Sequence, residues 1–183
     1  MKIVFLDRDG VINKYPGDTR YVASWGEFHF LPGVKKALRR LTEAGYRIFI
    51  VSNQAGVAKG IYSKETLDEI TGNMLKEVSE SGSKICAVYY CLHRDEDNCS
   101  CRKPKIGLLE KAIKEQNIPK EVLSNSFFVG DSIRDIQTGK SADCQTILVF
   151  SGKEKSGNQN AWLVQPDFAA KDLTEAVNII LSL

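Results

Sequence analysis

Two carboxylates near the start of the chain, Asp7 and Asp9, lie one residue apart and directly after a short apolar run. That run, residues 3–6, contains β-branched and aromatic side chains and is typical of a buried strand. Two acids this close repel one another unless a cation or a shared proton lies between them. The pair and the Gly10 that follows therefore indicate either a reactive or metal-binding site, or a solvated turn of the kind that Asp and Gly also favour.

A second acidic pair, Asp131 and Asp135, occurs where another apolar run meets a predicted helix. If the strand that ends at Asp131 is a neighbour of the first strand, then Asp7, Asp9 and Asp131 converge on one small volume. Three oxygen donors without sulfur or imidazole suit Mg²⁺, a hard ion that keeps several waters. The alternative is that Asp131 and Asp135 are acids at the start of a helix, where they interact favourably with the helix dipole.

Neutral and cationic side chains could complete a site for a phosphate group. Ser52 and Asn53 end a predicted strand, and their hydroxyl and amide could bind the oxygens of an anion, although Ser-Asn after a strand is more often only a turn. Lys103 supplies the positive charge that a phosphate beside several carboxylates requires. The adjacent Arg102 could bind a second phosphate through two parallel hydrogen bonds. Two solvated loop cations are the alternative.

Three cysteines and one histidine form two closely spaced pairs, Cys91-x-His93 and Cys99-x-Cys101. Side chains two residues apart in an extended segment point to the same side, so each pair can contribute two ligands to one ion. Three thiolates and one imidazole are typical of a closed, structural zinc site. We therefore expect residues 91–101 to form a zinc loop, with three loop cysteines and an unrelated histidine as the alternative.

Strands and helices alternate along the chain, which predicts an α/β fold with a doubly wound, parallel sheet. We expect one domain over residues 1–183. Expected strands cover residues 3–6, 47–52, 85–91, 127–131 and 146–150, with a short sixth strand at 161–164; expected helices cover residues 33–45, 63–81, 107–116, a segment that begins near 133, and 172–181. Parallel strands place their carboxyl ends along one edge of the sheet. Four potentially reactive groups would meet at that edge: Asp7, Ser52, Cys91 and Asp131.

The composition excludes several classes of protein. Of 183 residues, 25 are Lys or Arg and 23 are Asp or Glu, and the net charge of +2 is too small to favour nucleic acid or a membrane surface as a partner. No apolar run approaches the length of a membrane span, and the apolar residues before Asp7 are too few for a secretory signal. Five cysteines in such a chain favour metal or thiol roles over disulfides. We therefore expect a cytoplasmic monomer.

The chain resembles the haloacid dehalogenase superfamily of phosphotransferases over essentially its whole length. The motifs D-x-D-G, S/T-N, K and G-D-x-x-x-D occur in that order, at Asp7, Ser52, Lys103 and Asp131. The resemblance implies a Rossmann-like core in which Asp7 is the nucleophile and accepts the phosphoryl group as an aspartyl phosphate. It also implies that Asp9 protonates the leaving alcohol and then activates the water that hydrolyses the intermediate.

The same resemblance implies roles for the remaining motif residues. Three ligands of Mg²⁺ are implied: Asp7, the backbone carbonyl of Asp9, and Asp131. Ser52 and Lys103 would stabilise the phosphoryl group during its transfer. Asp135 would support Lys103 or the shell of the metal.

Within the superfamily, the zinc loop followed by Arg102-Lys103-Pro104 resembles two related groups without a cap domain, the D-glycero-D-manno-heptose 1,7-bisphosphate 7-phosphatases and the histidinol-phosphatases. No insertion in the chain is large enough for a separate cap. Residues 53–60, N-Q-A-G-V-A-K-G, and residues 130–135, G-D-S-I-R-D, resemble the heptose group more. Lys59 stands where many of those relatives carry Arg, which leaves open whether this position contacts phosphate.

The reaction implied by the heptose group removes the C7 phosphate from a small phosphorylated sugar, heptose bisphosphate. Arg102, with Lys103 nearby, would recognise the sugar or its remaining C1 phosphate. Asn53 would position the phosphate to be cleaved. The product would serve the synthesis of activated heptose for surface polysaccharide.

Two alternatives remain open at this point. Histidinol phosphate or another small phosphomonoester would use the same chemistry. A signalling receiver domain also combines an Asp cluster, Mg²⁺, a Ser or Thr and a Lys on a doubly wound sheet, but its phospho-acceptor follows a middle strand and no zinc loop precedes its Lys. Here the middle strands end in Ser52 and Cys91, so we rank the receiver domain far behind the phosphatases.

Overall fold

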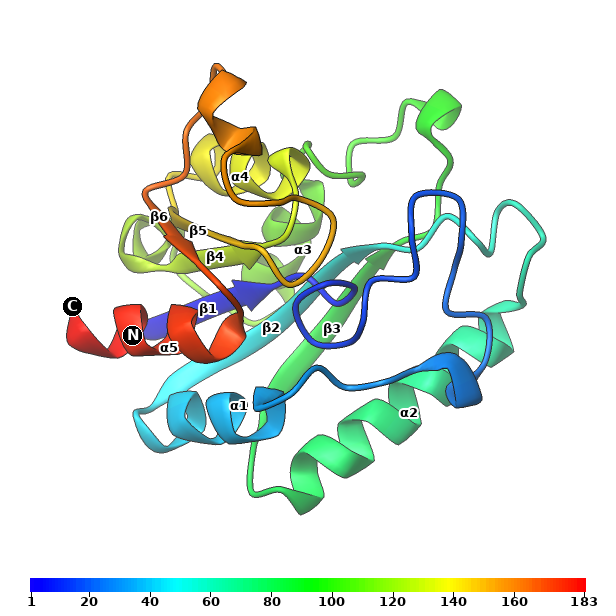
Figure 1. Ribbon diagram of the computed structural model, residues 1–183, viewed down its shortest axis with the longest axis horizontal. Helices are drawn as coiled ribbons and strands as arrows, with labels where there is room; N and C mark the ends of the chain where they lie inside the picture. Colours follow the sequence, from blue (N-terminus) through cyan, green and yellow to red (C-terminus); the bar gives the residue numbers. More distant parts are fainter.

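Six parallel strands form one sheet in the computed structural model, which describes residues 1–183. The strands are β1 (Lys2–Leu6), β2 (Tyr46–Asn53), β3 (Ile85–Cys91), β4 (Phe127–Gly130), β5 (Gln145–Val149) and β6 (Phe168–Ala170). Their order across the sheet is β3-β2-β1-β4-β5-β6. The predicted α/β fold with a doubly wound, parallel sheet is confirmed (Figure 1).

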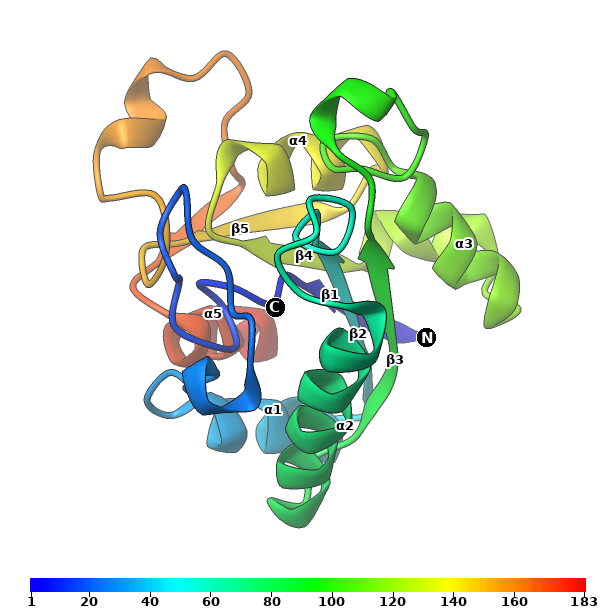
Figure 2. The same cartoon turned by 90° about the vertical axis from the view of Figure 1, so that its right-hand side faces the viewer.

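Five α-helices pack on the two faces of the sheet. They are α1 (Val34–Glu43), α2 (Lys64–Glu80), α3 (Gly107–Glu115), α4 (Ile133–Ser141) and α5 (Leu173–Ser182). Helices α1, α2 and α5 lie on one face, and α3 and α4 lie on the other (Figure 1, Figure 2). Short 3₁₀ helices lie in the connections, at Trp25–Glu27, Asp95–Asp97, Lys120–Asn125 and Asn158–Ala161. Apart from the sixth strand, every expected element is present, with ends within two residues of the expected ones.

Because helices cover both faces of the sheet, the central strands are apolar along their whole length rather than in alternation. Val4 and Leu6 of β1 are fully buried in the cluster that includes α1 and α5, whereas Phe5 is buried on the opposite face. Phe5 stacks on Phe49 and Phe128, with ring centroids 5.6 and 6.4 Å away. This packing holds β1 at the centre of the sheet and therefore determines where the residues directly after it lie.

The strand order reverses between β1 and β4. Strands β2 and β3 continue from β1 on one side, and β5 and β6 continue from β4 on the other. Phe5 lies opposite Phe128 in this central pair, and the backbone N–H of Asp7 donates to the carbonyl of Val129 at 3.0 Å. In open parallel sheets a crevice for ligands forms where the order reverses, beyond the carboxyl ends of the strands. Asp7 and Asp131 both lie at this place.

The predicted sixth strand at residues 161–164 is wrong. That segment pairs with no strand, and Leu163 within it is fully exposed. Strand β6 begins instead at Phe168, directly after Asp167, whose carboxylate accepts hydrogen bonds from the backbone N–H and the hydroxyl of Thr146 on β5. An apolar run predicts a buried strand only if a partner strand is within reach, and this anchor to β5 lies beyond residue 164.

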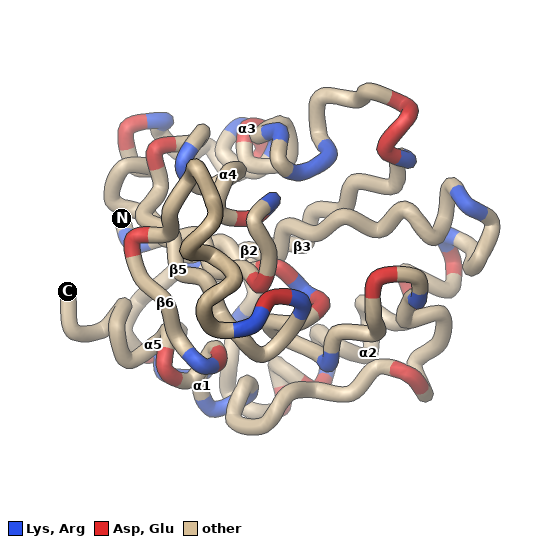
Figure 3. The backbone as a smooth tube through the Cα atoms, turned by 45° about the horizontal axis from the view of Figure 1, so that its top comes forward, with Lys and Arg blue, Asp and Glu red and all other residues tan.

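Loops at the carboxyl edge of the sheet surround the crevice, and no second domain is inserted among them. Charged residues of both signs are interspersed along the chain (Figure 3), in agreement with the small net charge of +2. None of the helices combines the length and the apolar character that crossing a membrane requires.

Candidate active site

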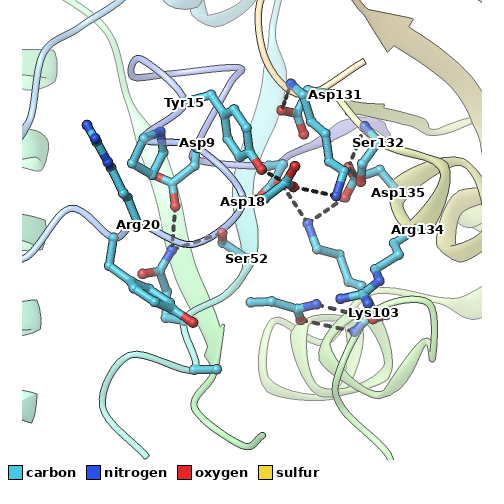
Figure 4. Close-up of a pocket in the computed structure, with 18 of the residues that line it drawn as sticks. Asp9, Tyr15, Asp18, Arg20, Ser52, Lys103, Asp131, Ser132, Arg134 and Asp135 are labelled. Carbon is cyan, nitrogen blue, oxygen red and sulfur yellow. Dashed lines mark hydrogen bonds and ion pairs between the residues drawn. The ribbon is translucent and has the colours of Figure 1, made fainter. Parts of the chain in front are cut away.

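A polar cleft opens at the carboxyl ends of β1, β2 and β4. Figure 4 shows side chains from several separate loops that point into it. All the predicted site residues outside the zinc loop line it: Asp7, Asp9, Ser52, Asn53, Arg102, Lys103, Asp131 and Asp135. The fold therefore gathers in one place residues that are far apart in the sequence.

Asp7 and Asp135 flank the ammonium group of Lys103 at the bottom of the cleft. Lys103 Nζ lies 3.0 Å from Asp7 Oδ2 and 2.5 Å from Asp135 Oδ1, and its side chain is only 3% exposed (Figure 4). Burial raises the pKa of Asp7 to about 6 despite the opposing charge of Lys103, because removal from water disfavours the ionised carboxylate. Burial alone would lower the pKa of Lys103, but Asp135 and Asp7 raise it, so the ammonium group stays charged.

Asp131 adds another buried carboxylate to this group. Its pKa lies well above the usual value because of burial and of the nearby charges of Asp135 and Asp7. Its Oδ2 accepts a hydrogen bond from the backbone N–H of Lys153 at 2.7 Å. Gly10 leaves the space for this oxygen, since a Cβ at Gly10 would lie 2.0 Å from Asp131 Oδ2. Gly10 also has a φ of +83°, a conformation that side chains other than hydrogen disfavour.

The carboxylates fit a divalent cation. Ligand oxygens of Asp7, Asp131 and Asp135 lie within 4.8 Å of one another. Both oxygens of Asp135 already accept hydrogen bonds, Oδ1 from Lys103 and Oδ2 from the backbone N–H and hydroxyl of Ser132 at 3.1 and 2.5 Å. Burial raises the pKa of Asp7 and of Asp131, and the unfavourable burial of their charge is what a hard ion such as Mg²⁺ relieves. Asp135 caps α4, as the helix-start alternative anticipated, and it also holds Lys103.

Ser52 and Asn53 at the end of β2 make different contacts. Ser52 is close enough to Asp7 to lower the pKa of that carboxyl through a hydrogen bond, in opposition to the larger effect of burial. Asn53 binds the backbone of Lys103 with both ends of its amide: Oδ1 accepts from the N–H at 3.0 Å and Nδ2 donates to the carbonyl at 3.2 Å. Asn53 thus attaches the loop of Lys103 to β2, a contact that the sequence did not reveal.

The Asp9 carboxylate is held by donors on its inner side. Arg8 approaches it with Nε and Nη2 at 3.1–3.2 Å, and Asn13 Nδ2 and Gln54 Nε2 each donate at 2.8 Å. Arg8 is fully buried, whereas the Asp9 side chain is 20% exposed at the cleft (Figure 4). The sequence analysis assigned no role to Arg8, Asn13 or Gln54; an arginine between two aspartates was the one signal that could have indicated this contact.

Cations surround the mouth of the cleft: Arg20, Lys59, Arg102, Arg134 and Lys153. The Asp95 carboxylate is hydrogen-bonded to Arg102 Nε and lies 3.6 Å from Arg134 Nη1, so both guanidinium groups point toward the same carboxylate oxygen, Asp95 Oδ1. On another side, Lys153 Nζ lies 2.7 Å from Asp18 Oδ1. Of the five cations only Arg102 was predicted as a site residue; Lys59 and Arg134 lie in stretches that resemble the heptose group without an assigned role, and Arg20 and Lys153 lie in loops without a motif.

The four residues of the predicted zinc loop converge at the end of β3. The three cysteine sulfurs lie 3.3–3.7 Å apart, and His93 Nδ1 lies 3.6 Å from Cys91 Sγ and 3.3 Å from Cys101 Sγ. With Zn–S bonds of about 2.3 Å, the sulfur ligands of a tetrahedral site lie roughly 3.8 Å apart, which is close to this spacing. Burial opposes the charge of the Cys99 thiolate, but backbone N–H groups of Arg102 and Cys101 lower its pKa to about 7. The donor set and its geometry fit zinc.

Known proteins resemble the chain over most of its length. A family model described as polynucleotide kinase 3 phosphatase matches residues 2–182. The D-glycero-beta-D-manno-heptose-1,7-bisphosphate 7-phosphatase of Pseudomonas aeruginosa is 36% identical over 151 residues, which are 82% of each chain. The D-glycero-alpha-D-manno-heptose-1,7-bisphosphate 7-phosphatase of Campylobacter jejuni is 38% identical over 157 residues, 86% of this chain and 87% of that one. The chain belongs to the heptose bisphosphate phosphatase family.

Solved structures place this family in the haloacid dehalogenase superfamily. The D,D-heptose 1,7-bisphosphate phosphatase from B. bronchiseptica, complexed with magnesium and phosphate, has a TM-score of 0.89 and 31% identity, and the match covers 100% of this chain and 99% of that one. A HAD-like phosphatase from Mesorhizobium loti has a TM-score of 0.79 and 29% identity, over 100% of this chain and 85% of that one. The resemblance inferred from the motifs is confirmed, and the chain is a phosphatase rather than a receiver domain.

We expect the substitution Gly10→Ala to weaken Mg²⁺ binding and phosphatase turnover, because the new Cβ displaces the Asp131 carboxylate. A displacement of about 1 Å costs on the order of 10²-fold in turnover. Calorimetric titration with Mg²⁺ and phosphate release from p-nitrophenyl phosphate measure the two effects. Gly45→Ala is the matched control, since Gly45 has a φ of +80° and a Cβ there meets no atom within 4 Å. Equal behaviour of the two variants would show that the contact with Asp131 is unimportant.

Proposed function

We propose that this protein hydrolyses D-glycero-D-manno-heptose 1,7-bisphosphate at the C7 phosphate through an aspartyl-phosphate intermediate. One observation carries the reaction type: Asp7 lies at the end of β1, in contact with Lys103 and close to Asp131, in a cleft lined by further cations. The assignment of the substrate is supported by the curated relatives, which are named heptose bisphosphate phosphatases.

Asp7 would act as the nucleophile. One of its carboxylate oxygens attacks phosphorus, the bond from phosphorus to the C7 oxygen breaks, and the phosphoryl group is transferred to Asp7. The leaving oxygen takes a proton from the Asp9 carboxyl group. Lys103 Nζ, 3.0 Å from Asp7 Oδ2, would bind phosphoryl oxygens as their charge develops, and the Ser52 hydroxyl would bind another.

In the hydrolysis of the intermediate, Asp9 would act as a base instead of an acid. The Asp9 carboxylate accepts a proton from a water molecule, whose oxygen attacks phosphorus and releases inorganic phosphate from Asp7. Asp9 is protonated again at the end of this step and is ready for the next substrate. Its contacts with Arg8 and Gln54 stabilise the carboxylate that is present between the two steps.

Asp7, Asp131 and the backbone carbonyl of Asp9 would hold Mg²⁺. The ion supplies charge neutralisation for the phosphate and the buried carboxylates. The neighbour structure from B. bronchiseptica is complexed with magnesium and phosphate, and the carboxylates of Asp7 and Asp131 in this chain are close enough to bind one ion together. Asp135 would support the site through Lys103, because its Oδ1 binds the ammonium group and its Oδ2 is held by Ser132.

The phosphate that stays on the sugar would bind at the mouth of the cleft. Arg102 has a side chain that is 14% exposed, and its guanidinium group meets that of Arg134 at the carboxylate of Asp95. A phosphate has the charge and the oxygen geometry that two guanidinium groups bind. Asn53 takes part indirectly, because its amide holds the backbone of Lys103.

Zinc bound by Cys91, His93, Cys99 and Cys101 would be structural. The loop that these residues form leads directly into Arg102 and Lys103, so a fixed metal cluster fixes the start of the cationic segment. A cytoplasmic location and a monomeric state stay predictions from the sequence.

The substrate is tested by phosphate release with Mg²⁺ from both anomers of the heptose bisphosphate, because the relatives carry both anomeric names. Histidinol phosphate is the competing substrate in the same assay. We expect kcat/KM for at least one anomer to exceed that for histidinol phosphate. Faster hydrolysis of histidinol phosphate would contradict the substrate assignment and leave the chemistry intact.

Asp7→Asn should reduce phosphate release to the detection limit, since an amide cannot accept the phosphoryl group. The fold should persist, because burial already disfavours the charge of Asp7. The assay is combined with thermal unfolding and zinc analysis. Asp68→Asn, on the exposed side of α2, is the matched control and should retain full activity. Undiminished hydrolysis by Asp7→Asn would refute the assigned nucleophile.

Arg102→Ala should lower kcat/KM for the bisphosphate by about 10- to 100-fold, because this factor corresponds to the free energy of one hydrogen bond to a charged group. Heptose 7-phosphate, which lacks the second phosphate, should be affected much less. Arg39→Ala serves as control, because Arg39 lies on the surface of α1 and pairs only with Glu43. An equal loss with both substrates would show that Arg102 does not recognise the second phosphate.

Cys99→Ser should lower the bound zinc and the melting temperature together, because structural zinc contributes to the free energy of folding. Metal analysis of the purified protein and calorimetric melting measure the two quantities. Cys86→Ser removes a cysteine outside the cluster and should change neither. An unchanged zinc content in Cys99→Ser would contradict the four-ligand site.

A further inference from the structure

The side-chain amide of Gln54, in the wall of the cleft, connects four polar groups. The residue follows β2 and is only 2% exposed. Its Nε2 donates to Asp9 Oδ2 at 2.8 Å and to Ser52 Oγ at 3.3 Å. Its Oε1 accepts from the hydroxyl of Tyr62 at 2.7 Å and from Arg8 Nη2 at 3.0 Å. Stabilisation of the Asp9 carboxylate explains only one of these four contacts.

The partners of Gln54 allow only one orientation of its amide. Arg8 can only donate hydrogen bonds, so the amide oxygen must face it, and a carboxylate can only accept, so the amide nitrogen must face Asp9. Tyr62 fits this orientation: burial raises the pKa of Tyr62 to about 12, so its hydroxyl keeps the proton that it donates to Oε1. A rotation of the amide by 180° would break the contacts with Arg8 and Asp9.

Tyr62 reaches Gln54 because the loop between them is shaped for it. Tyr62 is 7% exposed, and its ring lies against the backbone of Gly56. A Cβ at Gly56 would lie 2.2 Å from Tyr62 Cε1, so any larger residue would push the ring away. The glycine in the stretch N-Q-A-G therefore serves the contact of Tyr62 with Gln54.

Gln54 is one of three side chains that hold the carboxyl group of Asp9 from the interior. The other two are Arg8 and Asn13, both fully buried. Asp9 Oδ1 accepts a hydrogen bond from Asn13, Oδ2 accepts one from Gln54, and Arg8 donates to both oxygens. Without Gln54, Oδ2 loses its shortest contact, and the plane of the carboxyl group is no longer determined on that side.

We propose that Gln54, oriented by Tyr62, is a positioning residue that aims the carboxyl group of Asp9 at the leaving oxygen of the substrate. The proposal rests on the proposed function, in which Asp9 gives its proton to that oxygen. When the bond between phosphorus and oxygen breaks, its electron pair stays on the leaving oxygen, and the Asp9 proton is transferred there. The carboxylate that remains then accepts the hydrogen bonds of Gln54 and Arg8.

The dependence on the leaving group distinguishes this role from a merely structural one. The alkoxide of a sugar is a strong base and requires the proton of Asp9 as it departs, whereas p-nitrophenolate is stable without one. The ratio kcat/KM reports the steps up to the transfer of the phosphoryl group to Asp7. A misplaced Asp9 therefore slows the hydrolysis of the sugar phosphate selectively, while a general disturbance of the site slows both substrates.

The experiment compares kcat/KM for the heptose bisphosphate and for p-nitrophenyl phosphate in Gln54→Leu and Tyr62→Phe. General acid catalysis contributes about 10²- to 10⁴-fold, so we expect a loss of roughly tenfold or more for the sugar phosphate in Gln54→Leu and of less than about threefold for the aryl phosphate. Tyr62→Phe should show the same selectivity with a smaller loss, because Arg8 still binds the amide oxygen. Tyr46→Phe, whose hydroxyl meets only the carbonyl of Ile180 at 3.4 Å, is the matched control and should change neither value.

A parallel loss with both substrates, or no loss with either, would overturn the proposal. If Gln54→Leu does not fold, Tyr62→Phe, which removes a single oxygen atom, decides between these outcomes. The substrate assignment fails independently: a wild-type enzyme that hydrolyses another sugar phosphate instead of the heptose bisphosphate contradicts that assignment. The ratio between the two leaving groups is then measured with the sugar phosphate that the enzyme accepts.

Discussion

The ammonium group of Lys103, buried between the carboxylates of Asp7 and Asp135, is the contact on which the whole site depends. Removal of charges from water is costly, and a buried ion pair persists only where additional hydrogen bonds satisfy it. Asp135 meets this condition through Ser132, and Lys103 meets it through the two carboxylates that its ammonium group contacts, while Asn53 holds its backbone in place. The acids still exceed the cations at this place, which favours a divalent cation, and the cation in turn makes room for a phosphate.

Three long-range connections bring Lys103 to this position. Asn53 ties its backbone to the end of β2, the zinc loop ends two residues before it, and Asp135 at the start of α4 binds its ammonium group. The reversal of strand order between β1 and β4 sets Asp7 and Asp131 on either side of the same crevice. The carboxylate cluster and the Cys/His cluster are therefore connected, since the loop after β3 carries Arg102 and Lys103 and the strand ends carry Asp7 and Asp131.

The cleft relies on loops for recognition, since no cap domain covers it. Cations from four loops and from the start of α4 line its mouth, and Asp95 occupies the place between Arg102 and Arg134 where an anionic group of a substrate would compete for the same guanidinium groups. Gln54, which lines the cleft, binds Asp9, and the buried Tyr62 holds Gln54. Lys59 at the mouth and these two side chains belong to one loop, between β2 and α2.

The sequence by itself determined the class of fold, the motif residues that the fold gathers in the cleft and the four candidate zinc ligands, because apolar runs, turn residues and closely spaced donors are local features. Only the tertiary structure decided the place of β6, the attachment of Asn53 to Lys103 and the contacts of Arg8, Gln54 and Tyr62. The physical reason is that a buried polar group must find its partner across the fold. Which partner it finds depends on which loops the sheet brings together, and no spacing along the chain shows this.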